Sequence, residues 1–104
     1  MKYLITESQI DRVIFKYLDN QDFIIVEKNN IISFVNSEND KYVQIRFDRD
    51  GGWCSIERKL MEEVASFFSI LNTQSLSAIS MWSRNKIGLN PRAVEARQNI
   101  PARF

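Results

Sequence analysis

The stretch YVQIRFDRDGG, residues 42–52, decides the fold class of this chain. Val43, Ile45 and Phe47 alternate with polar residues, which is the period of a strand that buries one of its faces. The DRDGG that follows has the residue types of a tight turn. We therefore expect an antiparallel sheet with one buried face, in which residues 42–47 form one strand.

Two further strand-like runs precede this one. FIIV, residues 23–26, and IISFV, residues 31–35, are apolar and rich in β-branched side chains. Asn29 and Asn30, which lie between them, tolerate the left-handed backbone that a turn needs. After the glycines, residues 53–55 either add a short fourth strand or lead directly into a helix. The sequence thus predicts a meander of three to four antiparallel strands.

Helical periodicity flanks the sheet in the sequence. A first helix is predicted over residues 7–20, because a capping box at Thr6–Gln9 precedes apolar residues with helical spacing. A second helix is predicted over residues 56–71 for the same spacing. Its expected core-facing residues are Ile56, Leu60, Val64, Phe67, Phe68 and Leu71.

The last third of the chain carries signals for one or two more helices. A third helix is predicted over residues 74–86, capped by Thr73 or Ser75 and ended by Gly88. An Asn-Pro pair then favours a further short helix over residues 91–99.

These elements together predict an α+β fold. It has an N-terminal helix, the antiparallel meander and two to three C-terminal helices, with the helices on one face of the sheet and the other face partly open. We expect residues 1–88 to form one domain and residues 89–104 to form a basic C-terminal tail or arm.

The composition argues against most enzyme chemistry. The 104 residues include no histidine and one cysteine, so a Ser–His or Cys–His nucleophile pair and a histidine-based zinc site are excluded. We therefore expect no enzyme activity, catalytic residue, metal or cofactor. The chain has no long apolar run typical of a membrane span or secretory leader, and a lone cysteine suits the cytoplasm, the host cytoplasm if a phage encodes the chain.

Charge is unevenly distributed along the chain. Residues 1–83 carry nine basic and twelve acidic side chains, a net charge of −3, whereas residues 84–104 carry five basic and one acidic, a net charge of +4. Such a segment can bind an acidic surface or a nucleic-acid backbone. It can also dock on its own domain or exchange with a second copy. The candidate partner-binding residues are Arg84, Lys86, Arg92, Arg97, Arg103 and Phe104.

Two further candidate sites lie outside this segment. One is a set of two aromatic and two basic residues that could combine base stacking with positive charge on the open sheet face. Its members are Trp53, Tyr42, Arg46 and Arg49. Cys54 could be either a reactive thiol near a helix start or a buried small apolar residue, and the absence of a histidine base favours the second interpretation.

Two resemblances to known families accompany these patterns. The opening MKYLITESQ resembles the start of small uncharacterised proteins encoded by phages, over residues 1–20 and more faintly over 53–70. This resemblance implies a phage-like source and no particular activity. Asp48 or Asp50 followed by Glu57 and Lys59 resembles the metal-binding core of the PD-(D/E)xK nuclease superfamily, which implies a metal-dependent nuclease.

The favoured hypothesis is a phage-like, non-enzymatic protein-binding or assembly module that uses its basic C-terminal segment or its open sheet face to bind a protein partner or a second copy of itself. The alternatives are a nucleic-acid-associated protein that binds through the C-terminal arginines and, more remotely, the nuclease. No membrane association is expected.

Overall fold

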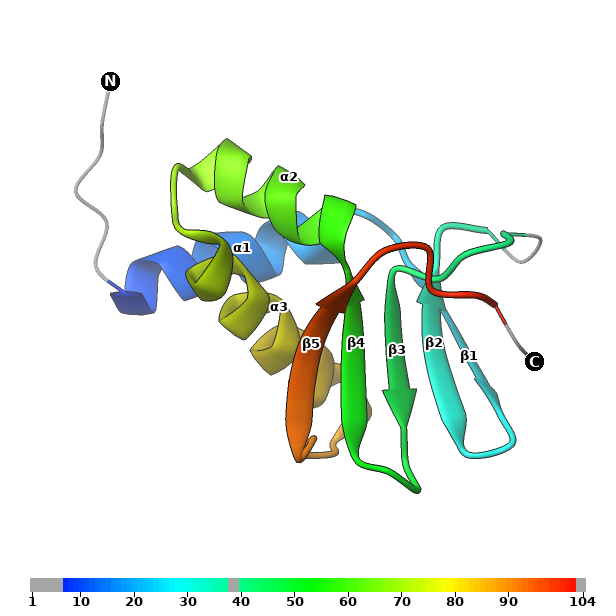
Figure 1. The fold of residues 1–104 in the computed structure, drawn as a ribbon. Coiled ribbons are helices and arrows are strands. Elements are labelled where there is room, and N and C mark those ends of the chain that lie inside the picture. The colour runs from blue at the N-terminus through cyan, green and yellow to red at the C-terminus, as the bar shows by residue number, and fades with distance from the viewer. Residues whose placement is uncertain (1–6, 38–39, 103–104) are drawn as a thin grey trace.

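The computed structural model describes residues 7–37 and 40–102, and the predicted α+β class is confirmed (Figure 1). Thr6, which begins the predicted capping box, lies outside the described residues. In chain order the elements are α1 (Glu7–Asp19), β1 (Ile24–Lys28), β2 (Ile31–Val35), β3 (Ile45–Asp48), β4 (Trp53–Glu57), α2 (Arg58–Phe68), α3 (Asn72–Ile87) and β5 (Ala93–Arg97).

The strands form one sheet in the order β1-β2-β3-β4-β5. The first four pair antiparallel with their neighbours, so the predicted meander is present with its optional fourth strand. β5 pairs with β4 in parallel. The sheet is therefore mixed and five-stranded, which corrects the expectation of an antiparallel meander of three to four strands alone.

The short helix predicted over residues 91–99 is wrong, because β5 occupies this segment. The backbone N–H groups of Arg92 and Ala93 donate to the carbonyl of Gly52, at 2.7 and 3.2 Å, and start the pairing with β4. Val94 and Ala96 then pack against the core with strand periodicity. The outer edge of β4 has backbone groups that a neighbouring strand can pair, and this outweighs the local preference for a helix.

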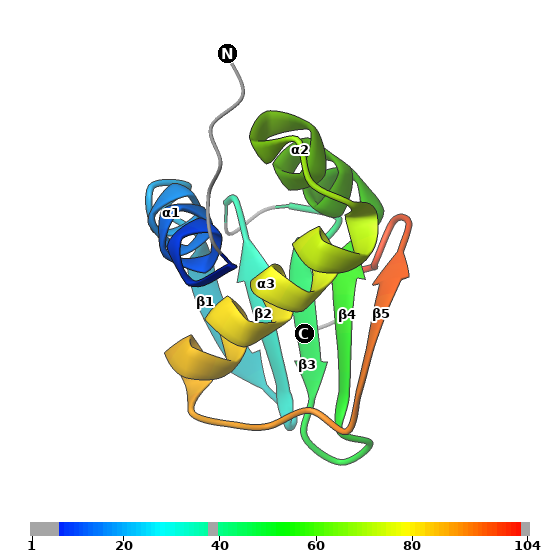
Figure 2. The same ribbon diagram turned by 90° about the vertical axis from the view of Figure 1, so that its left-hand side faces the viewer.

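All three helices lie on one face of the sheet, as the sequence predicts. Figure 2 shows α3 crossing that face diagonally between α1 and α2. The crossover through α2 and α3 returns the chain to the start of β5, as a parallel pair requires. The main core lies between the two layers, where Ile14, Phe34, Ile56 and Ile79 are fully buried.

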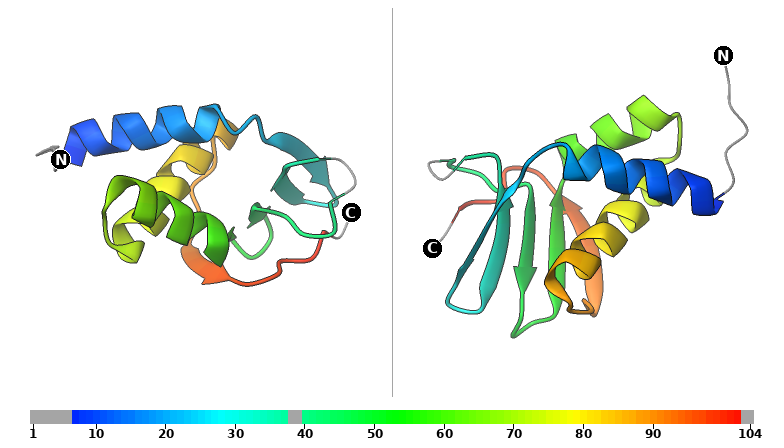
Figure 3. Two further views of the ribbon diagram at one scale, coloured as in Figure 1. Left: turned by 90° about the horizontal axis from the view of Figure 1, so that it is seen from above. Right: turned by 180° about the vertical axis from the view of Figure 1, so that it is seen from behind.

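Residues 98–102 continue from β5 across the end of the sheet (Figure 3). The Val43 N–H donates to the Ile100 carbonyl at 2.9 Å, and the Ala102 N–H donates to Lys41 at the same distance. Ile100 packs with Val35 and Val43 in a second, smaller cluster. This cluster lies on the face away from the helices, because Val35 points opposite to its core-facing neighbours on β2. One end of the helix-free face is therefore covered.

The helix α2 ends three residues earlier than predicted, in a Schellman motif. Ser69 adopts left-handed backbone with φ 54°. The Ile70 N–H donates to the Ala65 carbonyl at 2.9 Å, and the Ser69 N–H donates to Ser66 at 3.3 Å. The turn redirects the chain, and residues beyond Phe68 leave the core-facing stripe expected for one long helix.

The helix α3 begins two residues earlier than predicted, so its predicted caps are wrong. The Leu71 N–H donates to the Gln74 side-chain oxygen at 3.0 Å. Ser75 is buried inside the first turn of the helix, where its hydroxyl donates to the Met61 carbonyl at 2.7 Å and joins α3 to α2. Gly88 ends α3 in left-handed backbone, as predicted.

Candidate binding surfaces

The C-terminal basic residues predicted to bind a partner are dispersed over the molecule. Arg84 is exposed on α3, on the helix side of the sheet. Arg92 precedes β5, and Arg97 ends that strand with its side chain on the helix-free side. Arg103 and Phe104 lie outside the described residues. The structure therefore does not bring Arg84, Arg92 and Arg97 together as one surface.

Lys86 has a structural role between two helices. Its Nζ lies 2.8 Å from Asp19 Oδ1 and 5.7 Å from the centre of the Trp82 ring. The Trp82 indole N–H donates to the same Asp19 oxygen at 3.0 Å. The hydrogen bonds from Lys86 and then Trp82 lower the pKa of Asp19. These contacts fix the end of α1 against α3, so Lys86 is engaged within its own domain.

Trp53 lies at the uncovered end of the helix-free face and is 50% exposed. A side chain on Gly51 would place its Cβ 2.9 Å from the Trp53 ring, so the indole packs directly on this glycine. Asp48 Oδ1 accepts the N–H groups of Asp50 and Gly51, at 2.9 and 3.3 Å, and holds the turn below the ring. Trp53 is thus an exposed aromatic residue on a well-supported backbone.

A row of polar residues lies beside Trp53 on the same face. The Ser55 hydroxyl donates to Glu95 Oε1 at 3.1 Å, and Arg97 Nε lies 3.8 Å from that oxygen. Arg46, the cross-strand neighbour of Ser55, forms no ion pair or side-chain hydrogen bond with the described residues. The hollow they surround has a volume of about 220 Å³. It is lined by Arg46, Asp48, Trp53, Ser55, Glu95 and Arg97.

Only part of the predicted stacking set shares this face. Trp53 and Arg46 are close together, at the open end of the sheet. Tyr42 pairs with Pro101 at the opposite end of β3. Arg49 lies in the β3–β4 turn, where it forms a 2.7 Å ion pair with Glu27.

Of the residues that resemble the nuclease core, Asp48 and Asp50 are separated from Glu57 and Lys59. Asp48 pairs with Trp53 at one end of β4, whereas Glu57 is the last residue of that strand. The two positions are four residue steps apart along the strand, a distance of about 13 Å. Lys59 lies in the first turn of α2. In the part of the chain that the structure describes, no three His, Cys, Asp or Glu side chains are grouped to hold a metal ion.

Cys54 is buried under α3, which confirms the interpretation as a small core residue. Burial raises the pKa of its thiol from 9.0 to about 11, and the opposing effect of Ser83 is smaller. The thiol is therefore protonated at neutral pH, which is the opposite of a reactive cysteine.

A polar pocket of about 260 Å³ lies where β2 and β4 end, near the start of α2. Glu57 is its buried charged residue, 5% exposed, and its Oε2 accepts the Asn99 N–H at 3.1 Å. The nuclease-like motif contributes Glu57 and Lys59, but the other side chains come from segments far apart in the sequence, so the sequence does not indicate the pocket as a whole. Its lining residues are Gln21, Phe23, Asn36, Tyr42, Gln44, Glu57, Lys59, Leu60, Glu63 and Asn99.

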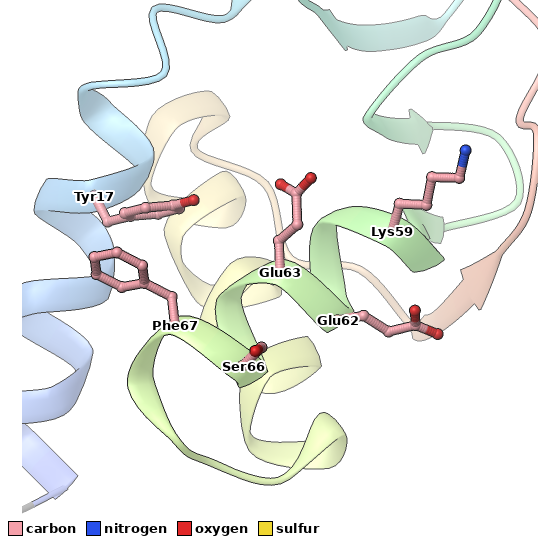
Figure 4. Close-up of a pocket in the computed structure, with 6 residues that line it drawn as sticks. All are labelled: Tyr17, Lys59, Glu62, Glu63, Ser66 and Phe67. Carbon is pink, nitrogen blue, oxygen red and sulfur yellow. The ribbon is translucent and has the colours of Figure 1, made fainter. Parts of the chain in front are cut away.

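An aromatic groove runs between α1 and α2. Figure 4 shows the ring of Tyr17 next to that of Phe67 at one end of the groove. The centres of the two rings are 5.0 Å apart. Phe67 and Leu71 are each 67% exposed, so their predicted core positions are wrong. Phe67 and Phe68 are adjacent on the helix and point about 100° apart, and of the two only Phe68 packs against the main core. Glu62 and Glu63 make the groove acidic.

Comparison with protein-family models, curated proteins and solved structures found no significant match to this chain. None of the helices in the described part of the chain has the length and apolar character needed to traverse a bilayer.

Proposed function

We propose that this protein is a non-catalytic binding module that contacts a protein partner, or a second copy of itself, through the uncovered end of its helix-free sheet face. The observation that carries the proposal is the half-exposed Trp53 beside Arg46 and Arg97. The phage-like source and the cytoplasmic location stay predictions from the sequence.

The chemistry of this face supports a protein partner. Tryptophan and arginine are the residue types that most often dominate interface energies. The Trp53 indole rests on Gly51, and Arg97 is oriented by Glu95, so little side-chain entropy is lost on binding. Acidic and basic groups alternate around the ring, which suits a partner with mixed charge rather than one of a single sign.

Fluorescence offers a direct test for self-association. Trp82 is buried whereas Trp53 is half exposed, so quenching by acrylamide reports mainly on Trp53. Self-association through this face should protect Trp53 as the protein concentration rises. Unchanged quenching, together with a monomeric mass by light scattering at every concentration, would exclude a second copy as the partner.

A different partner is tested by affinity capture with three forms of the chain. The wild type and Phe67→Ala should retain the same identified partner, because Phe67 is exposed on the helices instead. Trp53→Ala should weaken capture by about 30-fold, the effect of a typical interface hot spot. Equal capture by Trp53→Ala, or equal loss in Phe67→Ala, would contradict the proposed surface.

The nucleic-acid alternative has one observation in its favour. Arg46 and Arg97 flank an aromatic ring, which fits phosphate contacts beside a stacked base. Asp48 and Glu95 stand in the same hollow and would repel the phosphates. A mobility shift of single-stranded DNA or RNA that weakens steeply with salt and disappears in Trp53→Ala would assign this face to nucleic acid.

A further inference from the structure

The pocket at the end of the sheet contains a buried carboxylate that lacks a cationic partner. Glu57 is 5% exposed and accepts one hydrogen bond, from the Asn99 N–H. Glu57 is the N-cap residue of α2, but its side chain makes no capping hydrogen bond. It forms no ion pair within residues 7–37 and 40–102. Its neighbour on β5, Arg97, is directed to Glu95. Among the described residues no buried side-chain oxygen lacks a hydrogen-bond partner, so the second oxygen of Glu57, which accepts no hydrogen bond, is reached from the pocket and can accept a further donor.

The walls of the pocket carry further acceptors and aromatic rings. Glu63 adds a second carboxylate, and Asn36 and Gln44 add side-chain amides that make no hydrogen bond with the described residues. Phe23 and Tyr42 supply two ring surfaces. Lys59 is the basic residue among the lining side chains, so two carboxylates face one ammonium group and the pocket has a net negative charge.

These features suit a guanidinium group better than an ammonium group. A guanidinium is planar, always charged, and presents five N–H donors, which matches dispersed carboxylate and amide acceptors. It also stacks on aromatic rings, as Phe23 and Tyr42 would allow. A volume of about 260 Å³ accommodates one such side chain and leaves little room for a large ligand.

We infer that this pocket binds the guanidinium group of an arginine side chain presented by a protein partner, with Glu57 as its anchor. The inference rests on the proposed function in taking the partner to be a protein. Glu57 and Trp53 lie on the same side of β4, about 13 Å apart along the strand. Residues 98–102 cover this end of the face, so a partner on Trp53 would have to extend past that segment to reach the pocket.

The inference is tested with N-acetyl-L-arginine N-methylamide, which mimics an arginine within a chain. Titration followed by amide NMR should shift the Glu57 and Asn99 signals, because these two amides border the proposed contact. The matching lysine derivative should bind several-fold more weakly, and the citrulline derivative, which is uncharged but similar in shape, should not bind. Equal binding of citrulline, or no shift with arginine, would overturn the inference.

Two variants isolate the role of charge. Glu57→Gln keeps an oxygen for the Asn99 N–H but removes the negative charge, and it should weaken the arginine derivative about tenfold or more. Glu63→Gln, at an exposed position, should weaken it without affecting folding. Glu62→Gln is the matched control, since it lies on the same helix but outside this pocket. Full affinity in both Glu57→Gln and Glu63→Gln would contradict the inference, as would preferential binding of free L-arginine over the capped derivative.

The outcomes distinguish this inference from the proposed function. If partner capture depends on Trp53 but the arginine derivative does not bind, arginine binding in the pocket is contradicted and the proposed protein-binding function still holds. Binding of the derivative with no partner that depends on Trp53 would support the pocket and contradict the sheet-face proposal.

Discussion

Gly52 and Gly88 both adopt left-handed backbone but have different surroundings. Their φ values are 71° and 72°. A Cβ on Gly52 would lie 2.9 Å from Cγ of Arg92, whereas a Cβ on Gly88 would meet nothing within 4 Å. Gly52 also accepts the two backbone hydrogen bonds that start β5. A substitution at Gly52 thus combines backbone strain with a steric conflict.

We expect Gly52→Ala to reduce the free energy of unfolding by about 2 kcal/mol and Gly88→Ala by about 1 kcal/mol, since only the first adds a clash to the left-handed strain. Urea unfolding of both variants measures the difference. Equal reductions in the free energy of unfolding would show that the Arg92 side chain can move away from the added Cβ without destabilising the fold.

Cys54 links stability to alkaline pH. The folded thiol has a pKa of about 11 against an ordinary 9.0, so the unfolded chain releases its proton first as the pH rises. The contribution of the protonated thiol to the free energy of unfolding is fully present below pH 9 and is lost between about pH 9 and 11. Two pKa units correspond to a loss of about 3 kcal/mol.

The test compares unfolding free energies of the wild type and Cys54→Ala from pH 8 to 11. The variant should be less stable at pH 8, because it lacks a buried sulfur, but its alkaline decline should be shallower. Parallel curves would contradict the assigned burial effect. All other side chains are the same in the two proteins, so their contributions cancel in the comparison.

At the scale of elements, the end of α2 is closed by a serine where a glycine is usual. Ser69 holds left-handed backbone at φ 54°, in an exposed position. We expect Ser69→Gly to raise the free energy of unfolding by about 0.5–1 kcal/mol, because glycine adopts this conformation without a Cβ penalty.

Ser66→Gly, in the exposed interior of the same helix, should instead lower stability by about 0.5 kcal/mol. The two variants should therefore change the stability in opposite directions. Thermal unfolding of both measures this difference. A loss in both would mean that the entropy of the unfolded glycine chain outweighs the relief of strain.

At the scale of the whole molecule, the C-terminal segment completes the sheet. Its strand pairs with β4 along five residues, Val94 and Ala96 contact the main core, and Ile100 fills the second cluster. We expect a chain truncated after Asn90 to lose at least about 3 kcal/mol of stability, since several buried apolar contacts disappear together.

A chain ending at Ala102 keeps all of these contacts and serves as the control. Circular dichroism during urea unfolding measures both. Equal stability of the two chains would show that residues 91–102 behave as an appended arm.

The sequence alone determined the elements that depend on local signals. Hydrophobic alternation identified the third strand of the meander, and short apolar runs rich in β-branched residues identified the first two. The three-to-four spacing identified the three helices, and Gly88 ended the last of them, because each signal needs only neighbouring residues. The lone, buried Cys54 was likewise interpreted correctly from its residue type and the absence of histidine.

Tertiary structure alone decided the rest. Residues 93–97 became a strand because the folded chain presents the unpaired edge of β4, and no local pattern encodes that edge. The turn at Ser69 placed Phe67 and Leu71 at the surface although their spacing is that of a core face. The pocket around Glu57 unites segments from Gln21 to Asn99, and only the packing of helices on the sheet brings such distant side chains within reach of one ligand.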